Sequence, residues 1–299
     1  MSNVKHIRLY RLIARVIPLK YKLNFLIKPY IRHQDVLVIP YYNKFGICIL
    51  PNSGNQRTIS DIIFEGARYL PEFSLIKEIK KKLPGNFNYV DVGSNIGTTI
   101  WLFAGEVEKN YGYEPIPHLY NTIRDSIAVN NVSNITLVNK AVGNSAGVIK
   151  MLNNDNSNVL TEDIEGSVTS AITTLDDELK REQKIDLIKI DVEGFELRVL
   201  EGARNSIERF RPKLLVELHP EFIKNYGGDI ATVITLIEQV GYNISYYSFL
   251  YDLRSSRVRR FLNRFFTNSG KQFNTRKDFF EDIARKPELS SYHIFCEPR

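Results

Sequence analysis

Three short motifs carry the residues best suited to chemistry, and each follows an expected strand. The first, DVGSNIG at residues 91–97, has two glycines spaced G-x-x-x-G. Glycine lets a strand-to-helix turn approach a ligand closely, beyond the carboxyl ends of the strands where open α/β sheets bind ligands. The motif lacks the middle glycine of dinucleotide-binding turns and the lysine of phosphate-binding loops. Its acidic first residue suits a cationic ligand without phosphate, such as S-adenosylmethionine.

The second motif is YGYEP, which ends the next expected strand with Glu114, 21 residues after Gly93. A carboxylate in this place can accept hydrogen bonds from the hydroxyls of a ribose. A nucleoside ligand would need such a residue, whereas a phosphate-binding loop would not. The alternative is a surface glutamate that only precedes a proline.

The third motif, KIDVEGFE at residues 189–196, gathers three carboxylates at the end of one strand. Asp191 and Glu193 are expected to be catalytic, and Glu196 is expected to bind substrate. Two alternatives stay open, since the carboxylates could form a metal site or have structural roles. Glu196 in particular could begin a helix, where its charge is favoured by the helix dipole.

The following expected strand ends in ELHP, and strand alternation predicts that Glu217 and His219 lie on the same side. Glu217 is expected to bind substrate. His219 is expected to be a catalytic general base because imidazole titrates near neutral pH. A hydrogen-bonded structural histidine is the alternative.

These motifs lie in a stretch where expected strands alternate with helices from residue 88 onward. This order predicts an α/β domain with a mostly parallel sheet and helices on both faces. Residues 36–50 predict a pair of strands with a turn at 43–46, and residues 73–83 predict a helix. The polar residues 151–170 are expected to form a loop. Asp229 is expected to cap a helix that Gly241 ends.

At these residues the chain resembles the FkbM family of methyltransferases. The matching segments are YVDVGSNIGTTI, YGYEPIPHLYNTI, KAVGN, TTLDDEL, IDLIKIDVEGFELRVLEGA and RPKLLVEL. The resemblance implies a doubly wound, Rossmann-like sheet of about seven strands with an antiparallel last strand, and S-adenosylmethionine as the cofactor. It places Asp91, Gly93, Ser94, Asn95 and Gly97 at the methionine end of the cofactor, Glu114 at the ribose, Asn139 to Ala141 near the adenine, and Asp191 and Glu193 at the methyl group.

The resemblance also implies that a hydroxyl of a sugar, glycan or similar small molecule is methylated. Asp191, Glu193 or His219 could take the hydroxyl proton. Alternatively, carboxylates could hold a divalent ion such as Mg²⁺ that lowers the pKa of the hydroxyl. Two rival functions are an NAD-dependent oxidoreductase and a non-catalytic Rossmann-fold scaffold at a membrane surface.

Charge divides the chain into regions. The net charge is +6, yet residues 1–34 hold eight basic residues and no acidic one, so the remainder carries 32 basic against 34 acidic residues, a net of −2. A body without excess positive charge argues against a nucleic-acid partner. We expect a basic amphipathic head at 1–34, a hairpin and helix cap at 35–86, and a methyltransferase domain at 87–299 with a substrate-side insertion at 250–290.

The sequence holds no apolar run of about 20 residues that could span a bilayer, and no clean signal peptide. Its two cysteines, Cys48 and Cys296, form no disulfide framework. These features predict a cytoplasmic protein whose head can lie on the anionic inner face of a membrane. A head docked on its own domain or on a partner is the alternative, and the oligomeric state stays open.

We predict that the full chain floats with vesicles containing anionic lipid, whereas a chain that starts at Asp35 stays in the soluble fraction. The reason is the attraction of the eight basic side chains for the negative surface. Vesicle flotation measures both proteins side by side. Equal partitioning of the two chains would remove the head from any membrane contact.

Overall fold

The computed structural model describes residues 37–42, 45–49, 70–152, 159, 166–250, 270–285 and 290–299. The basic head at 1–34 and residues 251–269 and 286–289 of the expected insertion lie outside the described residues. The expected domain boundaries stay predictions.

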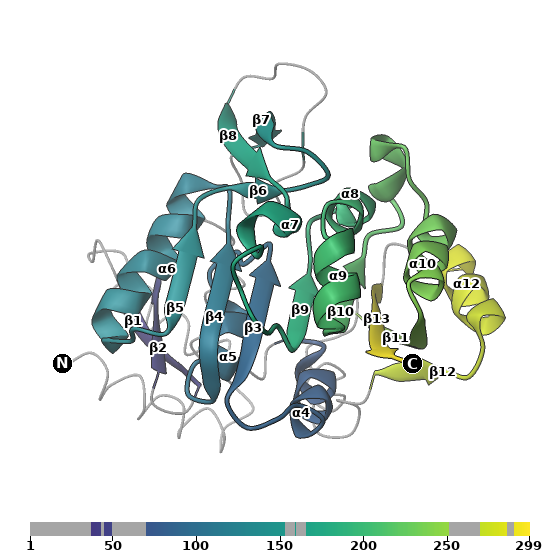
Figure 1. Ribbon diagram of the computed structural model, residues 1–299, viewed down its shortest axis with the longest axis horizontal. Helices are drawn as coiled ribbons and strands as arrows, with labels where there is room; N and C mark the ends of the chain where they lie inside the picture. Colours follow the sequence, from purple (N-terminus) through teal and green to yellow (C-terminus); the bar gives the residue numbers. More distant parts are fainter. Residues whose placement is uncertain are drawn as a thin grey trace, which may run out of the picture.

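An eight-stranded sheet runs through the molecule (Figure 1) in the order β12-β11-β13-β10-β9-β3-β4-β5. Its strands are β3 (Phe87–Val92), β4 (Val107–Tyr113), β5 (Ile135–Val138), β9 (Leu187–Ile190), β10 (Lys213–Leu218), β11 (Tyr242–Leu250), β12 (Lys271–Phe273) and β13 (Ser290–Pro298). The five neighbouring strands from β5 to β10 are parallel. β13 lies antiparallel between β10 and β11. The predicted sheet with an antiparallel last strand is therefore confirmed, and β12 adds a short strand at one edge.

Helices cover both faces of this sheet, as the alternating pattern predicts. They are α4 (Phe73–Lys81), α5 (Thr98–Phe103), α6 (Pro117–Asn130), α7 (Leu175–Glu178), α8 (Glu196–Glu201), α9 (Arg204–Phe210), α10 (Ile230–Gln239) and α12 (Arg276–Arg285), with a 3-10 turn, η2 (Ile223–Tyr226). Buried residues of α4 and α5 pack on one face. Buried residues of α7 to α10 and α12 pack on the other. Asp229 caps α10 by accepting a hydrogen bond from the Thr232 N–H at 2.7 Å.

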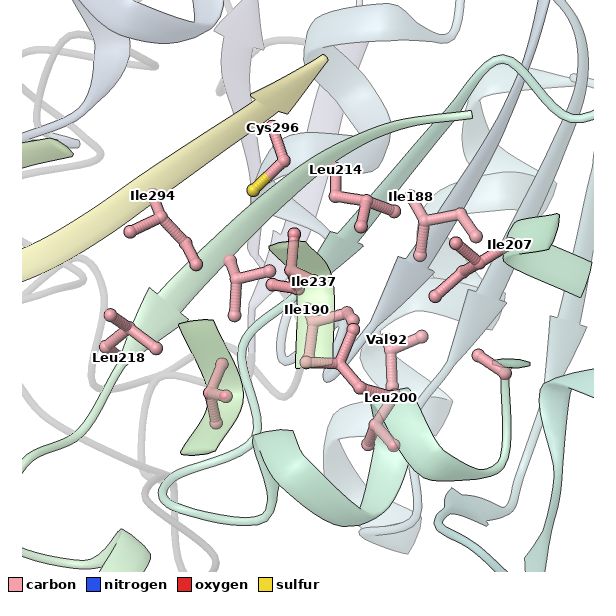
Figure 2. Close-up of a cluster of buried hydrophobic side chains, with 14 of the residues drawn as sticks. Val92, Ile188, Ile190, Leu200, Ile207, Leu214, Leu218, Ile237, Ile294 and Cys296 are labelled. Carbon is pink, nitrogen blue, oxygen red and sulfur yellow. The ribbon is translucent and has the colours of Figure 1, made fainter. Parts of the chain in front are cut away.

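The central strands are buried on both faces. All six residues of β3 are buried, as expected for a central strand of a parallel sheet with both faces covered, and they include the polar Asn88 and Asp91. Figure 2 shows the cluster on the α8–α10 face, where Ile188 and Ile190 of β9 meet Leu200 and Ile237. Burial of such side chains fixes the strands in register and so fixes the positions of the loops at their ends.

The N-terminal hairpin is confirmed, because β1 (Leu37–Tyr42) pairs antiparallel with β2 (Phe45–Ile49). A second small sheet was not predicted. It consists of β6 (Ala141–Val142), β7 (Gly147–Leu152) and β8 (Ser167–Thr173) in the order β6-β8-β7. In Figure 1 it stands above the upper ends of β4 and β3.

The expectation of a loop at 151–170 is wrong at both ends, because β7 and β8 pair there over six residues from each strand. Their backbone groups bond to each other, which the Asn/Ser/Thr-rich composition does not reveal. The sequence ITLVNKAVG at residues 135–143 does not form one continuous strand, since β5 and β6 belong to different sheets.

Among the described residues, none of the helices combines the length and the apolar character needed to cross a membrane.

We predict that Ile237→Ala lowers the free energy of unfolding by about 2–5 kcal/mol, because the cavity it leaves in a close-packed core is only partly refilled. Ile237 is 0% exposed in the cluster of Figure 2. Urea unfolding measures the change, with Val129→Ala as the control, because Val129 is 55% exposed. The control should change stability by less than about 0.5 kcal/mol. Equal midpoints for both variants would contradict this packing.

Candidate active site

The parallel strands bring the three sequence motifs together at one edge of the sheet. The carboxyl ends of β3, β4, β9 and β10 are neighbours there, and they carry the Gly93 turn, Glu114, the loop from Asp191, and His219 respectively. This is the edge at which open α/β sheets bind their ligands.

The glycine turn is built by close contact between β3 and β9. Gly93 has a φ of +82°, and a Cβ atom at this residue would lie 1.8 Å from the carbonyl oxygen of Asp191. No side chain fits in that space. The N–H groups of Gly93 and Ser94 both donate to the Tyr113 carbonyl, at 3.1 and 3.0 Å. The turn is therefore held by the strands on either side of it.

Glu114 joins the end of β4 to this turn. Its Oε2 accepts a hydrogen bond from the Asn95 N–H at 2.7 Å, and its Oε1 accepts one from the Ile116 N–H at 2.9 Å. The side chain is 3% exposed. Burial raises the pKa of Glu114 to about 8, although the two N–H donors act in the opposite direction.

A cavity opens between the turn and Glu114. It is lined by Val92, Gly93, Asn95, Tyr113, Glu114, Pro115, Lys140, Ala141, Val142, Met151, Val159, Asp191, Val192, Glu193 and Phe195. Six of the predicted site residues are therefore brought together around one space. They are Gly93, Asn95, Glu114, Ala141, Asp191 and Glu193.

Four predicted cofactor residues lie behind the cavity wall instead. Asp91 is fully buried, and Ser94 donates a hydrogen bond from its hydroxyl to the Asp91 carbonyl at 3.0 Å. Gly97 begins α5 with a φ of +81°. Asn139 donates to the carbonyls of Glu114 and Pro115, at 2.8 and 3.0 Å. These contacts hold the lining in place.

Lys189 is a residue that sequence reasoning missed. Its ammonium lies 2.9 Å from Asp191 Oδ2 and 3.8 Å from Asp91 Oδ1. Burial by itself would lower the pKa of Lys189, but the two carboxylates raise it above its usual value. Burial raises the pKa of Asp91 to about 6, although the positive charge of Lys189 acts in the opposite direction. The available signal was a charged residue at the third position of the buried strand LIKI, two residues before Asp191.

Asp191, Glu193 and His219 form the polar end of the site. His219 Nε2 lies 3.5 Å from Glu193 Oε2 and 3.8 Å from Asp191 Oδ1. Burial raises the pKa of Glu193 to about 7. Ligand atoms of the three residues lie within 4.8 Å of one another, so the group could hold a metal ion. Two carboxylates and one imidazole are donors that several divalent metals accept.

The two residues expected to bind substrate lie elsewhere. Glu196 is 0% exposed and accepts a hydrogen bond from the Gly194 N–H at 2.9 Å. Glu217 turns toward β13, where it accepts a hydrogen bond from Ser291 at 2.6 Å and faces His293. Burial alone would raise the pKa of Glu217, but His293 holds it well below its usual range. Neither residue borders the cavity, because both carboxylates are hydrogen-bonded to buried partners.

Apolar side chains complete the cavity, and sequence reasoning missed these too. Met151 and Val142 come from the small β6–β8 sheet, and Phe195 precedes α8. The Phe195 ring packs edge-on against Tyr226, with ring centroids 5.2 Å apart. A wall of this kind can hold the flat face of a nucleobase while carboxylates occupy the other end.

This strand order, with an antiparallel strand inserted between β10 and β11 and a glycine turn after β3, agrees with a methyltransferase of the S-adenosylmethionine-dependent class, which the family comparison supports. The family model of the methyltransferase FkbM domain matches residues 91–244, just over half of the chain, and the protein belongs to this family.

Solved structures with a similar course of the chain include three methyltransferases. An rRNA methylase from Streptococcus thermophilus is 11% identical, with 77% of this chain and 96% of that chain covered and a TM-score of 0.45. The methyltransferase FkbM from Methylobacillus flagellatus KT is 16% identical, with 82% and 56% covered and a TM-score of 0.40. A Streptococcus mutans protein described as a putative methyltransferase, in complex with SAH, is 10% identical, with 76% and 98% covered and a TM-score of 0.43. A search of curated proteins finds no match.

We predict that the affinity for S-adenosylmethionine rises between pH 6 and pH 8 through Glu114. The expected ribose hydroxyls would donate to the ionised carboxylate, whereas the free protein holds the proton because burial raises the pKa of Glu114 to about 8. Because the proton must be removed before binding, the affinity should fall by up to about tenfold for each pH unit below 8.

Calorimetry at several pH values should show a steeper rise for the wild type than for Glu114→Gln, which has no proton to lose. The difference between the two proteins isolates Glu114 from Asp91 and Glu193, because those residues titrate in both. Parallel curves would contradict the ribose contact.

Proposed function

We propose that the protein transfers the methyl group of S-adenosylmethionine to a hydroxyl of a sugar, a glycan or a similar small molecule. The observation that carries this proposal is the single cavity whose lining joins the Gly93 turn, Glu114 and the carboxylates of Asp191 and Glu193. A nucleoside, a cationic donor and an acceptor hydroxyl each need one of these parts.

The residues present fit the cofactor. Glu114 keeps its carboxylate at the cavity wall, where the hydroxyls of a ribose can donate to it. The opposite end holds Asp191 and Glu193, whose negative charge attracts a sulfonium. Burial raises the pKa values of both Glu114 and Glu193, and it outweighs the two N–H donors of Glu114 and the positive charge of His219 beside Glu193.

S-adenosylmethionine supplies an activated methyl group, so the protein mainly has to position the acceptor oxygen and remove its proton. Asp191 and Glu193 border the cavity and can accept hydrogen bonds from an acceptor hydroxyl. His219 lies beside both carboxylates and is 15% exposed. This arrangement supports a hydroxyl acceptor, because a hydroxyl needs a nearby group that takes its proton.

A labelled methyl donor tests the proposal. The protein is incubated with S-adenosylmethionine labelled in its methyl group and with a panel of glycans, free sugars and hydroxylated small molecules. We expect the label in a base-stable ether linkage on one of these acceptors. Label only on nitrogen, carbon or carboxyl groups would overturn the hydroxyl assignment.

We predict that Asp191→Asn lowers methyl transfer by about 10²–10⁴-fold, whereas the affinity for S-adenosylmethionine falls far less, because Glu193 still supplies a carboxylate at the same end of the cavity. The substitution removes a charge at the acceptor end, and Lys189 keeps its second carboxylate, Asp91. Single-turnover transfer and calorimetry measure the two effects separately. Asp125→Asn is the control because that carboxylate is exposed on α6. Undiminished transfer by Asp191→Asn would remove Asp191 from the reaction.

A further inference from the structure

Glu196 is a buried carboxylate that the proposed reaction has not used. It is the first residue of α8 and is 0% exposed. Its Oε1 lies 2.6 Å from His219 Nδ1 and also accepts the Gly194 N–H at 2.9 Å. The backbone donor fixes the carboxylate in place, and the carboxylate in turn fixes the imidazole ring.

This contact determines which nitrogen of His219 can accept a proton. A carboxylate oxygen accepts hydrogen bonds, so Nδ1 carries a proton that it donates to Glu196. The neutral ring therefore has its lone pair on Nε2. Nε2 is also the atom that faces Glu193 and Asp191, at 3.5 and 3.8 Å, and both of those residues border the cofactor cavity.

We propose that His219 is the general base of the methyl transfer and that Glu196 is the residue that positions it; the inference rests on the proposed function. The acceptor oxygen forms a bond to the methyl carbon while the carbon–sulfur bond breaks and its electron pair stays on sulfur. The hydroxyl proton passes to Nε2 of His219. The resulting imidazolium is stabilised by Glu196 at Nδ1, as a carboxylate stabilises the histidine of a catalytic triad.

The charges around His219 agree with this role. Glu196 from α8 and the pair Glu193 and Asp191 from the loop after β9 lie beside the ring. Glu217 of β10 turns toward β13 and adds only a more distant negative charge. Burial alone would lower the pKa of His219, but the hydrogen bond to Glu196 and the neighbouring carboxylates raise it well above its usual value. The histidine is thus a stronger base than a free imidazole.

The substitution Glu196→Gln tests the inference through the pH dependence of the rate. For the wild type, kcat should rise with pH along a limb whose apparent pKa lies well above 6.5. Because the variant lacks the negative charge that raises this pKa, its limb should move to lower pH. Its plateau should fall on the order of 100-fold, since the base is less well oriented. The KM for S-adenosylmethionine should stay unchanged.

Two matched variants complete the design. Glu201→Gln changes the last residue of the same helix, which pairs with Arg198, and should leave the profile unchanged. His219→Gln should abolish the limb. A titration of the histidine ring protons by NMR, without acceptor, should show the same downward shift of the His219 pKa in Glu196→Gln.

Three results would overturn the inference. The first is a lower kcat in Glu196→Gln with an unmoved pH limb, which would mean a structural role only. The second is wild-type activity that EDTA abolishes and Mg²⁺ restores, which would make Nε2 a metal ligand. The third is a wild type that binds S-adenosylmethionine but methylates no hydroxyl, and this result alone would also overturn the proposed function.

Discussion

The site depends on a cluster of buried carboxylates whose negative charge the fold must offset. Asp91, Glu114 and Glu196 are each no more than 3% exposed at the same edge of the sheet. Removing an unpaired carboxylate from water is costly, so each has a specific partner. Lys189 forms ion pairs with Asp91 and Asp191. Two backbone N–H groups donate hydrogen bonds to Glu114, and His219 is hydrogen-bonded to Glu196. The remaining deficit of positive charge is what a sulfonium ligand can fill.

The order of the parallel strands brings these carboxylates together. In register, Asp91 of β3 is the partner of Lys189 of β9, and both side chains lie on the face that α4 and α5 cover. The carboxyl ends of β9 and β10 then bring Glu196 and His219 together, although 23 residues separate them. The apolar cores on the two faces hold these strands so firmly that distances of a few ångströms persist between loops from different parts of the chain.

The sequence predicted the residues whose positions depend only on a strand and its end. The glycine turn, Glu114 and the Asp191–Glu193 pair border the cavity because each motif ends a buried parallel strand. The sequence did not reveal which side chains are held by buried hydrogen-bond partners. Glu196 and Glu217 look equally available in sequence, yet their partners, His219 and Ser291, lie 23 and 74 residues away. Only packing between distant segments decides that these two carboxylates are buried.

The close approach of Gly93 to the Asp191 carbonyl has a consequence for how two ligands communicate. With no space between these loops, a molecule that shifts the turn after β3 also shifts the loop that carries Asp191. Donor and acceptor would then influence each other's affinity, and by thermodynamic linkage the influence has equal size in both directions.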